Sequence, residues 1–525
     1  MENVTQFLRG VEVDHRRAAA LLTGAVCGVG ALVVLVRKVN SRMETKEKIQ
    51  RARNRRTESL QRAEQTLLRY QQSHPSTKAA LILSLSLSEL TKQLQDGSLN
   101  PEEVLYSYME KVQYVMNQVR VMSLLPSYLT LLSLQRKNYD SSCGVSCYLD
   151  QPVQEDSVIV QVLKKQGAIP FVKTNLPQKT SGGSSGGEGA LIGGGGSLLG
   201  IGTDIGGSIR IPSSFCGICG FKSTAGRLSS RGLRPIYRGQ KSVLSSAGPM
   251  ARDVDSLALC MRALLCDHMF SLDPTVPPLP FNLQIYQSTK PLRIGYLEND
   301  GYAQPSPSMA RGVREVKALL EQAGHTLVAY HPPKVPYAMS ELVMKGVLAD
   351  GATTLLQKLE GEPLDPCLRS QVVPYYLPNW LKKTLSFLLK PLSPRGAPVL
   401  SALCGTIEHW RRCNIDVLLC PAIGPAFNFH YCGKLTSLAS VTMLYNLLTF
   451  PAGIVPVSTV TAEDEEEMKH YKGNYQDMWD MLFKQAVSGG EGLPVAVQCV
   501  ALPWQDELCL RFMKEVEQLV RQSRS

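Results

Sequence analysis

The pattern of hydrophobic and polar positions becomes that of a globular chain after residue 75. An amphipathic stretch from Leu85 to Leu94 predicts a helix. A second helix is predicted to begin at Asn100-Pro101, where a capping asparagine precedes a proline and two acidic residues. A third is predicted from Asp156 through Lys165, followed by a strand in the apolar run 168–172. The order is therefore helix, then strand.

The same alternation recurs toward the C-terminus. An amphipathic helix is predicted from about Met309 to Ala323. Short apolar runs predict strands at Leu292 to Leu297, Thr326 to Tyr330, Ile415 to Cys420 and Ala452 to Val457. Alternating helices and apolar strands predict an α/β domain around a largely buried sheet.

A different pattern precedes this domain. Ala18 to Val36 is a run of nineteen residues without a charge, about the length that crosses a bilayer as a helix. It ends at Arg37-Lys38 and stays basic, which is typical of a stop-transfer sequence and not of a cleaved signal peptide. Residues 1–36 are therefore predicted to be a tail and a transmembrane helix with its span at 18–36. More Lys and Arg follow the span than precede it, so the C-terminal body is expected to face the cytoplasm, at an endomembrane.

The net charge of +11 is concentrated in one segment. Residues 37–75 hold eleven Lys and Arg against four Glu. This segment is predicted to be a juxtamembrane stripe for anionic lipid, which is compatible with a solvated helix. The remaining body is nearly balanced in charge, so nucleic-acid binding is not predicted.

A second stretch with a possible membrane role lies at residues 374–392. It places leucines on one face, with Trp380 beside them and lysines at the border. A membrane-surface helix has this pattern. An ordinary core helix shows similar spacing, and both interpretations stay open.

The fourteen cysteines are scattered through a long chain, which fits a reducing compartment better than a disulfide framework. Cys216 and Cys219 form a lone CxxC pair. Zinc would need a second ligand pair, so two small buried thiols are the favoured interpretation.

Glycine and serine cluster at residues 181–196, and a related motif follows at 202–212. A flexible linker would not contain the apolar runs embedded there. A phosphate-binding loop would end in Gly-Lys-Ser/Thr, which is not present. The third interpretation is a catalytic backbone, because glycines let several N–H groups converge on one point, as an oxyanion hole requires.

A serine in such a turn can attack a carbonyl if a base removes its proton. The residues Gly182 to Gly186 match Gly-x-Ser-x-Gly, but no strand directly precedes them, as a nucleophile elbow would need. A histidine-based triad is therefore unsupported, although the sequence does not exclude one of the eight histidines.

These motifs resemble the amidase signature. Ser208 of Gly206-Gly207-Ser208 follows Ser184 by twenty-four positions. Family members use a Ser-Ser-Lys triad, so the resemblance implies that Ser208 is the acylated nucleophile and that Ser184 relays its proton. It further implies that the backbone N–H groups of Ile205, Gly206, Gly207 and Ser208 hold the oxyanion. The implied fold is a large twisted mixed sheet surrounded by helices, over residues 76–525.

Further stretches extend the resemblance to the integral-membrane fatty-acid amide hydrolases. They are Phe215 to Cys219, Leu272 to Pro280 and Leu493 to Trp504. The resemblance implies hydrolysis of long-chain fatty-acid amides, a lipid-amide substrate drawn from the membrane, no metal or organic cofactor, and homodimerisation as an option.

The chain departs from the family in one chemically important place. The strand that carries the base lysine is not found, and Lys137, the nearest candidate, lacks the expected flanking residues and is not assigned. Two further compact gaps follow Pro177 and Pro394. We interpret the three gaps as a splice form or an imperfect gene model, and the rival functional class is a non-catalytic member that binds lipid amides.

Asp204 and Arg210 flank the Ser208 loop with opposite charges. They are expected to hold the loop in shape, with ordinary surface charges as the alternative.

Overall fold

The structure is a computed structural model, and it describes most of the chain. The described residues are 15–74, 79–118, 137–174, 182–234, 243–347, 350, 353–359, 376, 410–427, 431, 435 and 438–525. Of residues 15–24, 27, 116–118, 340, 344 and 345 it describes the backbone alone.

Strands within these ranges form one mixed sheet in the order β1-β3-β2-β7-β8-β6-β4-β5. Their bounds are β1 Leu199–Asp204, β2 Cys219–Lys222, β3 Ser246–Ala251, β4 Arg293–Tyr296, β5 Thr326–Ala329, β6 Val417–Pro421, β7 Ala452–Thr459 and β8 Pro494–Ala501. β4 pairs in parallel with β5 and β6, and the other neighbours are antiparallel. The α/β class and the mixed sheet are confirmed.

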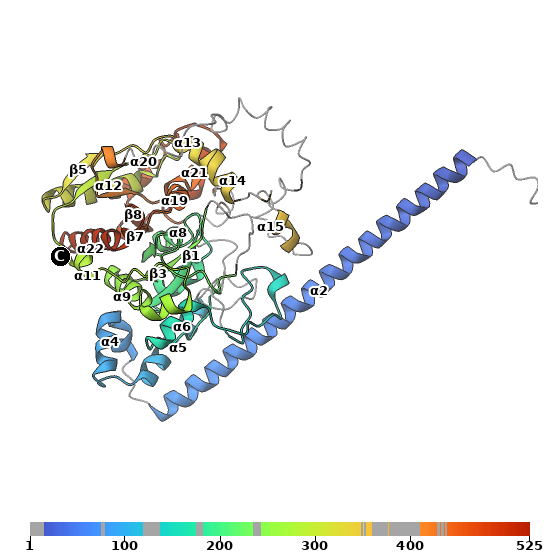
Figure 1. Cartoon of the computed structure of the whole chain (residues 1–525), viewed down its shortest axis with the longest axis horizontal. Helices are drawn as coiled ribbons and strands as arrows, with labels where there is room; N and C mark the ends of the chain where they lie inside the picture. The colour runs from blue at the N-terminus through green and yellow to red at the C-terminus, as the bar shows by residue number, and fades with distance from the viewer. Residues whose placement is uncertain are drawn as a thin grey trace, which may run out of the picture.

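Helices surround this sheet (Figure 1). The larger ones are α2 His15–Ser73, α4 Leu87–Gln95, α5 Pro101–Gln118, α6 Val158–Lys165, α7 Gly186–Gly193, α9 Val254–Leu264, α12 Pro307–Gln322, α19 Ser440–Leu447, α21 Met478–Val487 and α22 Asp506–Gln522. Shorter ones are α3 Ala79–Ser84, α8 Arg210–Phe215, α10 Asp267–Leu272, α11 Leu283–Gln287, α13 Val335–Tyr337, α14 Met344–Val347, α15 Thr353–Lys358 and α20 Ala462–Met468, with a 3₁₀ turn η2 Ser146–Tyr148 and a π-helix η3 Ala338–Val343.

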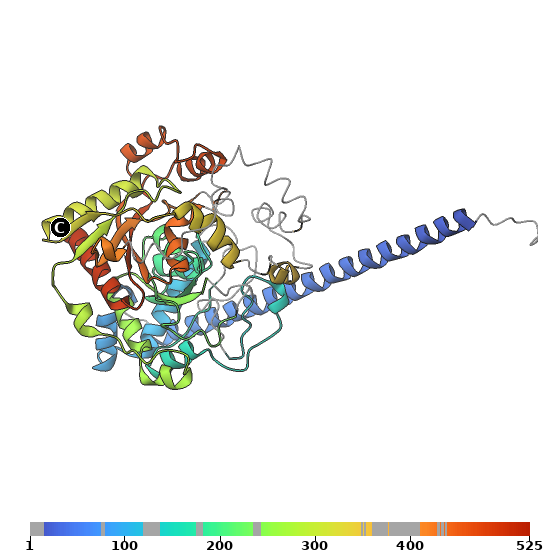
Figure 2. The same cartoon turned by 45° about the horizontal axis from the view of Figure 1, so that its top comes forward.

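The central strand β8 shows how the two faces of the sheet differ. Val497 and Cys499 belong to the main core, which includes residues of α9, α12 and α22. Because side chains alternate along a strand, Gln498 points to the opposite face, where it contacts Arg210 at the start of α8. Arg210 and the end of the loop that leads into α8 therefore lie on that opposite face. Figure 2 shows the globular body from a second side, with α2 projecting away from it.

Most predicted elements are confirmed to within a few residues. Ser86 caps α4 with a reciprocal contact to Glu89, which explains why that helix begins there. The predicted strand at 168–172 is wrong, since these residues adopt no strand. The partly buried side chains of Phe171 and Val172 instead pack against the cluster of Val112, Val115 and Leu191. Helices α5 and α7, and not a sheet, therefore cover this apolar run. Apart from Tyr376, the stretch 374–392 lies outside the described residues.

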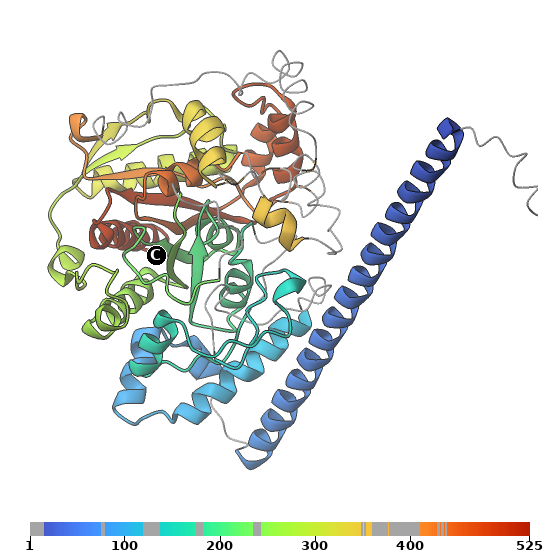
Figure 3. The same ribbon diagram turned by 45° about the vertical axis from the view of Figure 1, so that its right-hand side comes forward.

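The long helix α2 runs past the globular body (Figures 1 and 3). Its second half docks on that body: Ile49 and Ala52 pack against Leu149, and the rings of Tyr70 and Tyr106 stack with centroids 3.9 Å apart. Its first half carries exposed apolar side chains, including Val26 at 69% and Val34 at 65% exposure.

The predicted span 18–36 lies within α2, but the side chains of residues 18–24 and 27 are outside the described set. Among the residues whose side chains are described, no helix has the length and hydropathy needed to cross a bilayer. The backbone continues as helix through residue 36, the predicted boundary between anchor and basic segment.

Candidate active site

Ser208 lies in the short loop between β1 and α8, and Ser184 lies just before α7. The structure brings these two segments together. The backbone N–H of Ser185 donates to the carbonyl of Ser208 at 3.2 Å. On the other side of Ser184, a Cβ atom added to Gly183 would lie 2.8 Å from Cα of Ser208, so only glycine permits this approach. Both neighbours of Ser184 therefore touch the backbone of Ser208.

Ser185 also holds the segment of Ser184 in place, through contacts with β1. Its buried hydroxyl accepts from the N–H of Thr203 at 3.1 Å and lies 3.3 Å from the Thr203 carbonyl. A Cβ at Gly202 would come within 2.6 Å of the same hydroxyl. The start of α7 is thus held against the end of β1.

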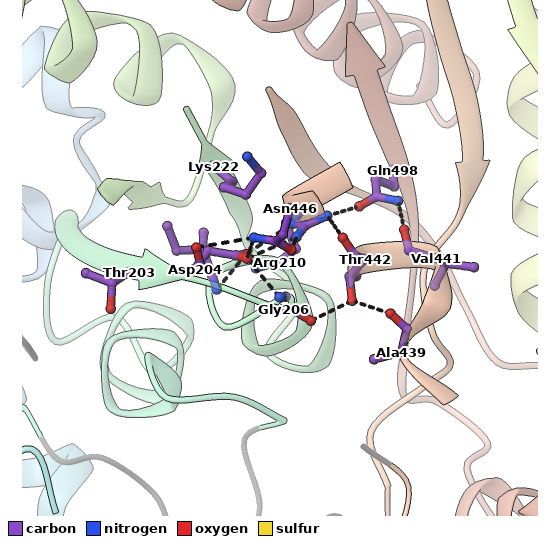
Figure 4. Close-up of polar contacts among 12 residues, drawn as sticks. Thr203, Asp204, Gly206, Arg210, Lys222, Ala439, Val441, Thr442, Asn446 and Gln498 are labelled. Carbon is purple, nitrogen blue, oxygen red and sulfur yellow. Dashed lines mark hydrogen bonds and ion pairs between the residues drawn. The ribbon is translucent and has the colours of Figure 1, made fainter. Parts of the chain in front are cut away.

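Asp204 organises the loop that carries Ser208 (Figure 4). Its carboxylate accepts from the backbone N–H groups of Gly207 at 2.8 Å and Ile209 at 3.1 Å. It also accepts from the side chain of Asn446 at 2.9 Å. One buried side chain therefore fixes the course of the backbone on both sides of Ser208.

Arg210 completes this network. Its guanidinium pairs with Asp204 at 3.0 Å, and both side chains are fully buried. It donates further to the carbonyl of Thr442 at 2.9 Å, to Gln498 at 2.8 Å and to Asn446 at 2.6 Å (Figure 4). Burial by itself would raise the pKa of Asp204, but Arg210 lowers it well below its usual range. The expectation that these charges hold the loop is confirmed, and the surface-charge alternative is wrong.

The backbone N–H groups of the loop are not equivalent. The N–H group of Gly207 donates to the carboxylate of Asp204. Within the described part of the chain, those of Ile205, Gly206 and Ser208 donate to no protein acceptor. The carbonyl of Gly206 accepts from the hydroxyl of Thr442 at 2.8 Å, which fixes that peptide plane. N–H groups held in this way can receive an external oxyanion without reorganising.

The sequence profile of the Amidase family matches residues 133–179 and 177–510. The chain belongs to the amidase family. It is 45% identical to fatty-acid amide hydrolase 1 of Sus scrofa, over 95% of this chain and 96% of that protein. It is 47% identical to the vitamin D3 hydroxylase-associated protein of Gallus gallus, over 77% of this chain and 96% of the relative. The chain is thus an amidase-signature hydrolase similar to fatty-acid amide hydrolases.

A solved structure described as fatty acid amide hydrolase shares the fold, with a TM-score of 0.68 and 24% identity over 86% of this chain and 88% of that one. The alignment with the pig protein spans 560 positions, more than this chain of 525 residues can fill. The chain therefore lacks positions that this relative has, in agreement with the gaps found in the sequence.

No described histidine of this amidase contacts either serine. His325 contacts Glu515 at 2.6 Å and the N–H of Leu292 at 3.0 Å, and His74 bonds within its own helix end. Lys137 is exposed, with its backbone N–H bonded to Asp156. Within the described ranges, neither these histidines nor Lys137 has a hydrogen bond to Ser184 or Ser208.

The cysteine prediction holds in part. Cys219 is buried and Cys216 is half-buried, and both are free thiols. Burial raises the pKa of Cys216 to about 12, so this thiol is poorly suited to redox or metal chemistry. The described residues contain no cluster of potential metal ligands.

The sequence analysis missed several residues of the site. Thr442 and Asn446 come from α19, more than two hundred positions after the loop, and no local motif marks them. Gln498 lay within a stretch that resembled the family, but nothing indicated its role. Lys173 was also missed as a buried amine.

Proposed function

We propose that this amidase hydrolyses long-chain fatty-acid amides through an acyl-serine intermediate at Ser208. The observation that carries the proposal is the contact of both neighbours of Ser184 with the backbone of Ser208. A second hydroxyl beside the nucleophile can take its proton and later deliver one to the leaving amine.

The steps follow from this arrangement. As the Ser208 hydroxyl attacks the amide carbonyl, its proton passes to the Ser184 oxygen while Ser184 passes its own hydroxyl proton on to the amide nitrogen. The oxyanion is stabilised by the N–H groups of Ile205, Gly206 and Ser208. The N–H group of Gly207 already donates to Asp204, so it can contribute only as a donor shared between Asp204 and the oxyanion. The C–N bond then breaks, the amine or ammonia leaves with a proton, and water releases the fatty acid.

The lipid character of the substrate is supported by the relatives and by α2. The first half of α2 projects from the body with apolar side chains such as Leu32 and Val36 exposed at 59% and 49%. Exposed apolar surface of this kind favours a membrane environment. The proposal therefore includes an anchor over residues 18–36, followed by a basic segment facing the cytoplasm. Homodimerisation stays a prediction.

A non-catalytic lipid-amide binder is the alternative function. It is favoured by two observations: the chain lacks positions that the pig relative has, and the expected base-lysine strand is not found in the sequence.

One experiment separates the two. The full-length protein in detergent is given a long-chain primary amide beside Ser208→Ala and the matched surface control Ser230→Ala, at equal folded concentration. Hydrolysis that Ser208→Ala abolishes and Ser230→Ala retains supports the amidase. Substrate binding without turnover in the folded wild-type protein supports the binder.

The anchor has its own test. Full-length protein is expected to float with phosphatidylcholine vesicles, and replacing Leu32 and Val36 by lysine is expected to reduce flotation. Equal flotation of both proteins would contradict the anchor.

A further inference from the structure

The peptide group between Gly206 and Gly207 is held at both of its ends. Its N–H donates to the carboxylate of Asp204 at 2.8 Å. Its C=O accepts from the hydroxyl of Thr442 at 2.8 Å (Figure 4). This peptide group links two of the N–H groups proposed to hold the oxyanion, those of Gly206 and Ser208. Its orientation therefore sets how these two donors lie relative to each other.

The Thr442 hydroxyl has one proton and two carbonyl neighbours. Its oxygen lies 2.8 Å from the carbonyl oxygen of Gly206 and 3.0 Å from that of Ala439, which precedes α19. The Ala439 carbonyl already accepts from the backbone N–H groups of Thr442 at 3.1 Å and Met443 at 2.8 Å. Because a carbonyl oxygen has two lone pairs, the hydroxyl proton is directed to Gly206.

Two adjacent residues of α19 also contact the glycines through their side chains. A Cβ atom added to Gly207 would lie 2.6 Å from Oγ1 of Thr442, and one added to Gly206 would lie 3.1 Å from Cε of Met443. Thr442 is 1% exposed and is branched at Cβ, which leaves its side chain few rotamers. The helix therefore presents the hydroxyl to the loop in a fixed place.

The backbone around Thr442 is fixed as well. The carbonyl of Thr442 accepts from Arg210 at 2.9 Å, and the carbonyl of Val441 accepts from Gln498 at 2.7 Å (Figure 4). Arg210 and Gln498 are both fully buried. The hydroxyl is thus in place before any oxyanion forms, and it need not reorganise when the charge develops.

We infer that Thr442 is a positioning residue for the reaction of this amidase, and this rests on the proposed function. Its hydroxyl holds the Gly206–Gly207 peptide group in the orientation at which the N–H groups of Gly206 and Ser208 both point at the oxyanion. Thr442 acts through the loop backbone and transfers no proton itself. Donors aimed at charge that develops only in the transition state raise kcat without tightening substrate binding. Thr442 should therefore affect kcat and leave KM nearly unchanged.

A structural role alone makes a different prediction. Threonines within helices commonly donate to a carbonyl of the preceding turn, and this bond affects only the helix. Thr91 of α4 is such a residue, since its hydroxyl donates to the carbonyl of Leu87 at 2.7 Å. Thr91→Val is therefore the matched control for Thr442→Val.

The test measures hydrolysis of a long-chain primary amide by full-length protein in detergent. Thr442→Val keeps the shape of the side chain and removes the hydroxyl. It is expected to lower kcat by about 10- to 100-fold and to change KM by less than about twofold. Thr442→Ser restores the hydroxyl and is expected to recover most of kcat. Thr91→Val is expected to keep the wild-type values of both.

A second readout follows the oxyanion itself. A long-chain trifluoromethyl ketone adds to a serine hydroxyl: the C–O bond forms, the carbonyl oxygen takes the electron pair, and the hydroxyl proton leaves. The inhibition constant of this probe should rise in Thr442→Val by the factor by which kcat/KM falls, because both report on the stabilised oxyanion. Urea unfolding checks that each variant is folded.

A lower kcat and weaker ketone inhibition in Thr442→Val, with recovery in Thr442→Ser, support the role of Thr442. Wild-type kcat in folded Thr442→Val, a change confined to KM, or equal losses of kcat in Thr442→Val and Thr442→Ser overturn it and leave the amidase intact. Thr442→Ala, judged by the same outcomes, replaces Thr442→Val should the latter fail to fold. Wild-type protein that does not hydrolyse the amide overturns the proposed function, and the role of Thr442 with it.

Discussion

Two sets of arginine and aspartate contacts hold parts of this chain together, and they differ in burial. Asp204 and Arg210, beside the loop that carries Ser208, are both fully buried. On the flank of the molecule, Arg51 and Arg55 of α2 pair with Asp150 at 2.9 and 2.6 Å, but the two arginine side chains are 51% and 46% exposed. Ion pairs between the same two residue types are therefore buried at the Ser208 loop and largely exposed at α2.

The difference decides what each set can do. A buried ion pair cannot lose one member without leaving an uncompensated charge, so it fixes the geometry of the loop. In an exposed pair, each charged group can exchange its partner for water at little cost in free energy. The attachment of α2 must therefore depend chiefly on its apolar contacts, such as those of Ile49 and Ala52 with Leu149.

Breaking the buried pair is expected to have the largest effect. Arg210→Met should lower the free energy of unfolding by about 3–5 kcal/mol, because Asp204 would remain buried without its partner. Urea unfolding of the full-length protein measures this. Arg314→Met is the control, since Arg314 and Glu298 are 49% and 39% exposed. Equal losses in the two variants would contradict the comparison.

The buried Lys173 should make stability depend on pH. Its pKa is lowered from 10.5 to about 8 in the folded protein, so between these values the unfolded chain binds more protons. The free energy of unfolding should therefore rise with pH across this window, by up to about 3 kcal/mol relative to Lys173→Met. Urea titrations of both proteins from pH 7.5 to 10 test this. Parallel curves would show that Lys173 is not desolvated.

Gly207→Ala probes the backbone of the loop that carries Ser208. Gly207 has φ +117, and a Cβ there would lie 2.6 Å from Oγ1 of Thr442. The expected loss is about 1–3 kcal/mol of stability, together with loss of turnover. Gly226→Ala is the matched control, because Gly226 has φ +82 but open space around it. A smaller loss in Gly207→Ala than in Gly226→Ala would mean that the loop adjusts freely.

The exposed pairs should matter least. Arg55→Gln is expected to cost under about 1 kcal/mol and to lose its effect at high salt. Melting curves at low and high ionic strength measure this. A loss as large as that in Arg210→Met would show that the flank contacts, and not the apolar ones, hold α2 in place.

Local sequence signals predicted much of the fold. The capping Asn100 before α5 and the apolar periodicity of α4 and α12 depend on neighbours a few positions away, so they appear in the sequence directly. The exception was the run 168–172. Its apolar side chains demanded burial, but periodicity cannot say whether a strand or a helix provides it.

The sequence by itself determined the two glycine-rich motifs. It thereby determined that the segments of Ser184 and Ser208 can lie close together, because only glycine allows backbones to approach as closely as they do at Gly183. Tertiary structure alone decided what surrounds them. Thr442, Asn446 and Gln498 reach Arg210 and the loop from distant elements, and Lys173 becomes a buried amine only when its segment packs on α7. Burial and the resulting pKa shift depend on all the atoms around a group, and no stretch of sequence contains those neighbours.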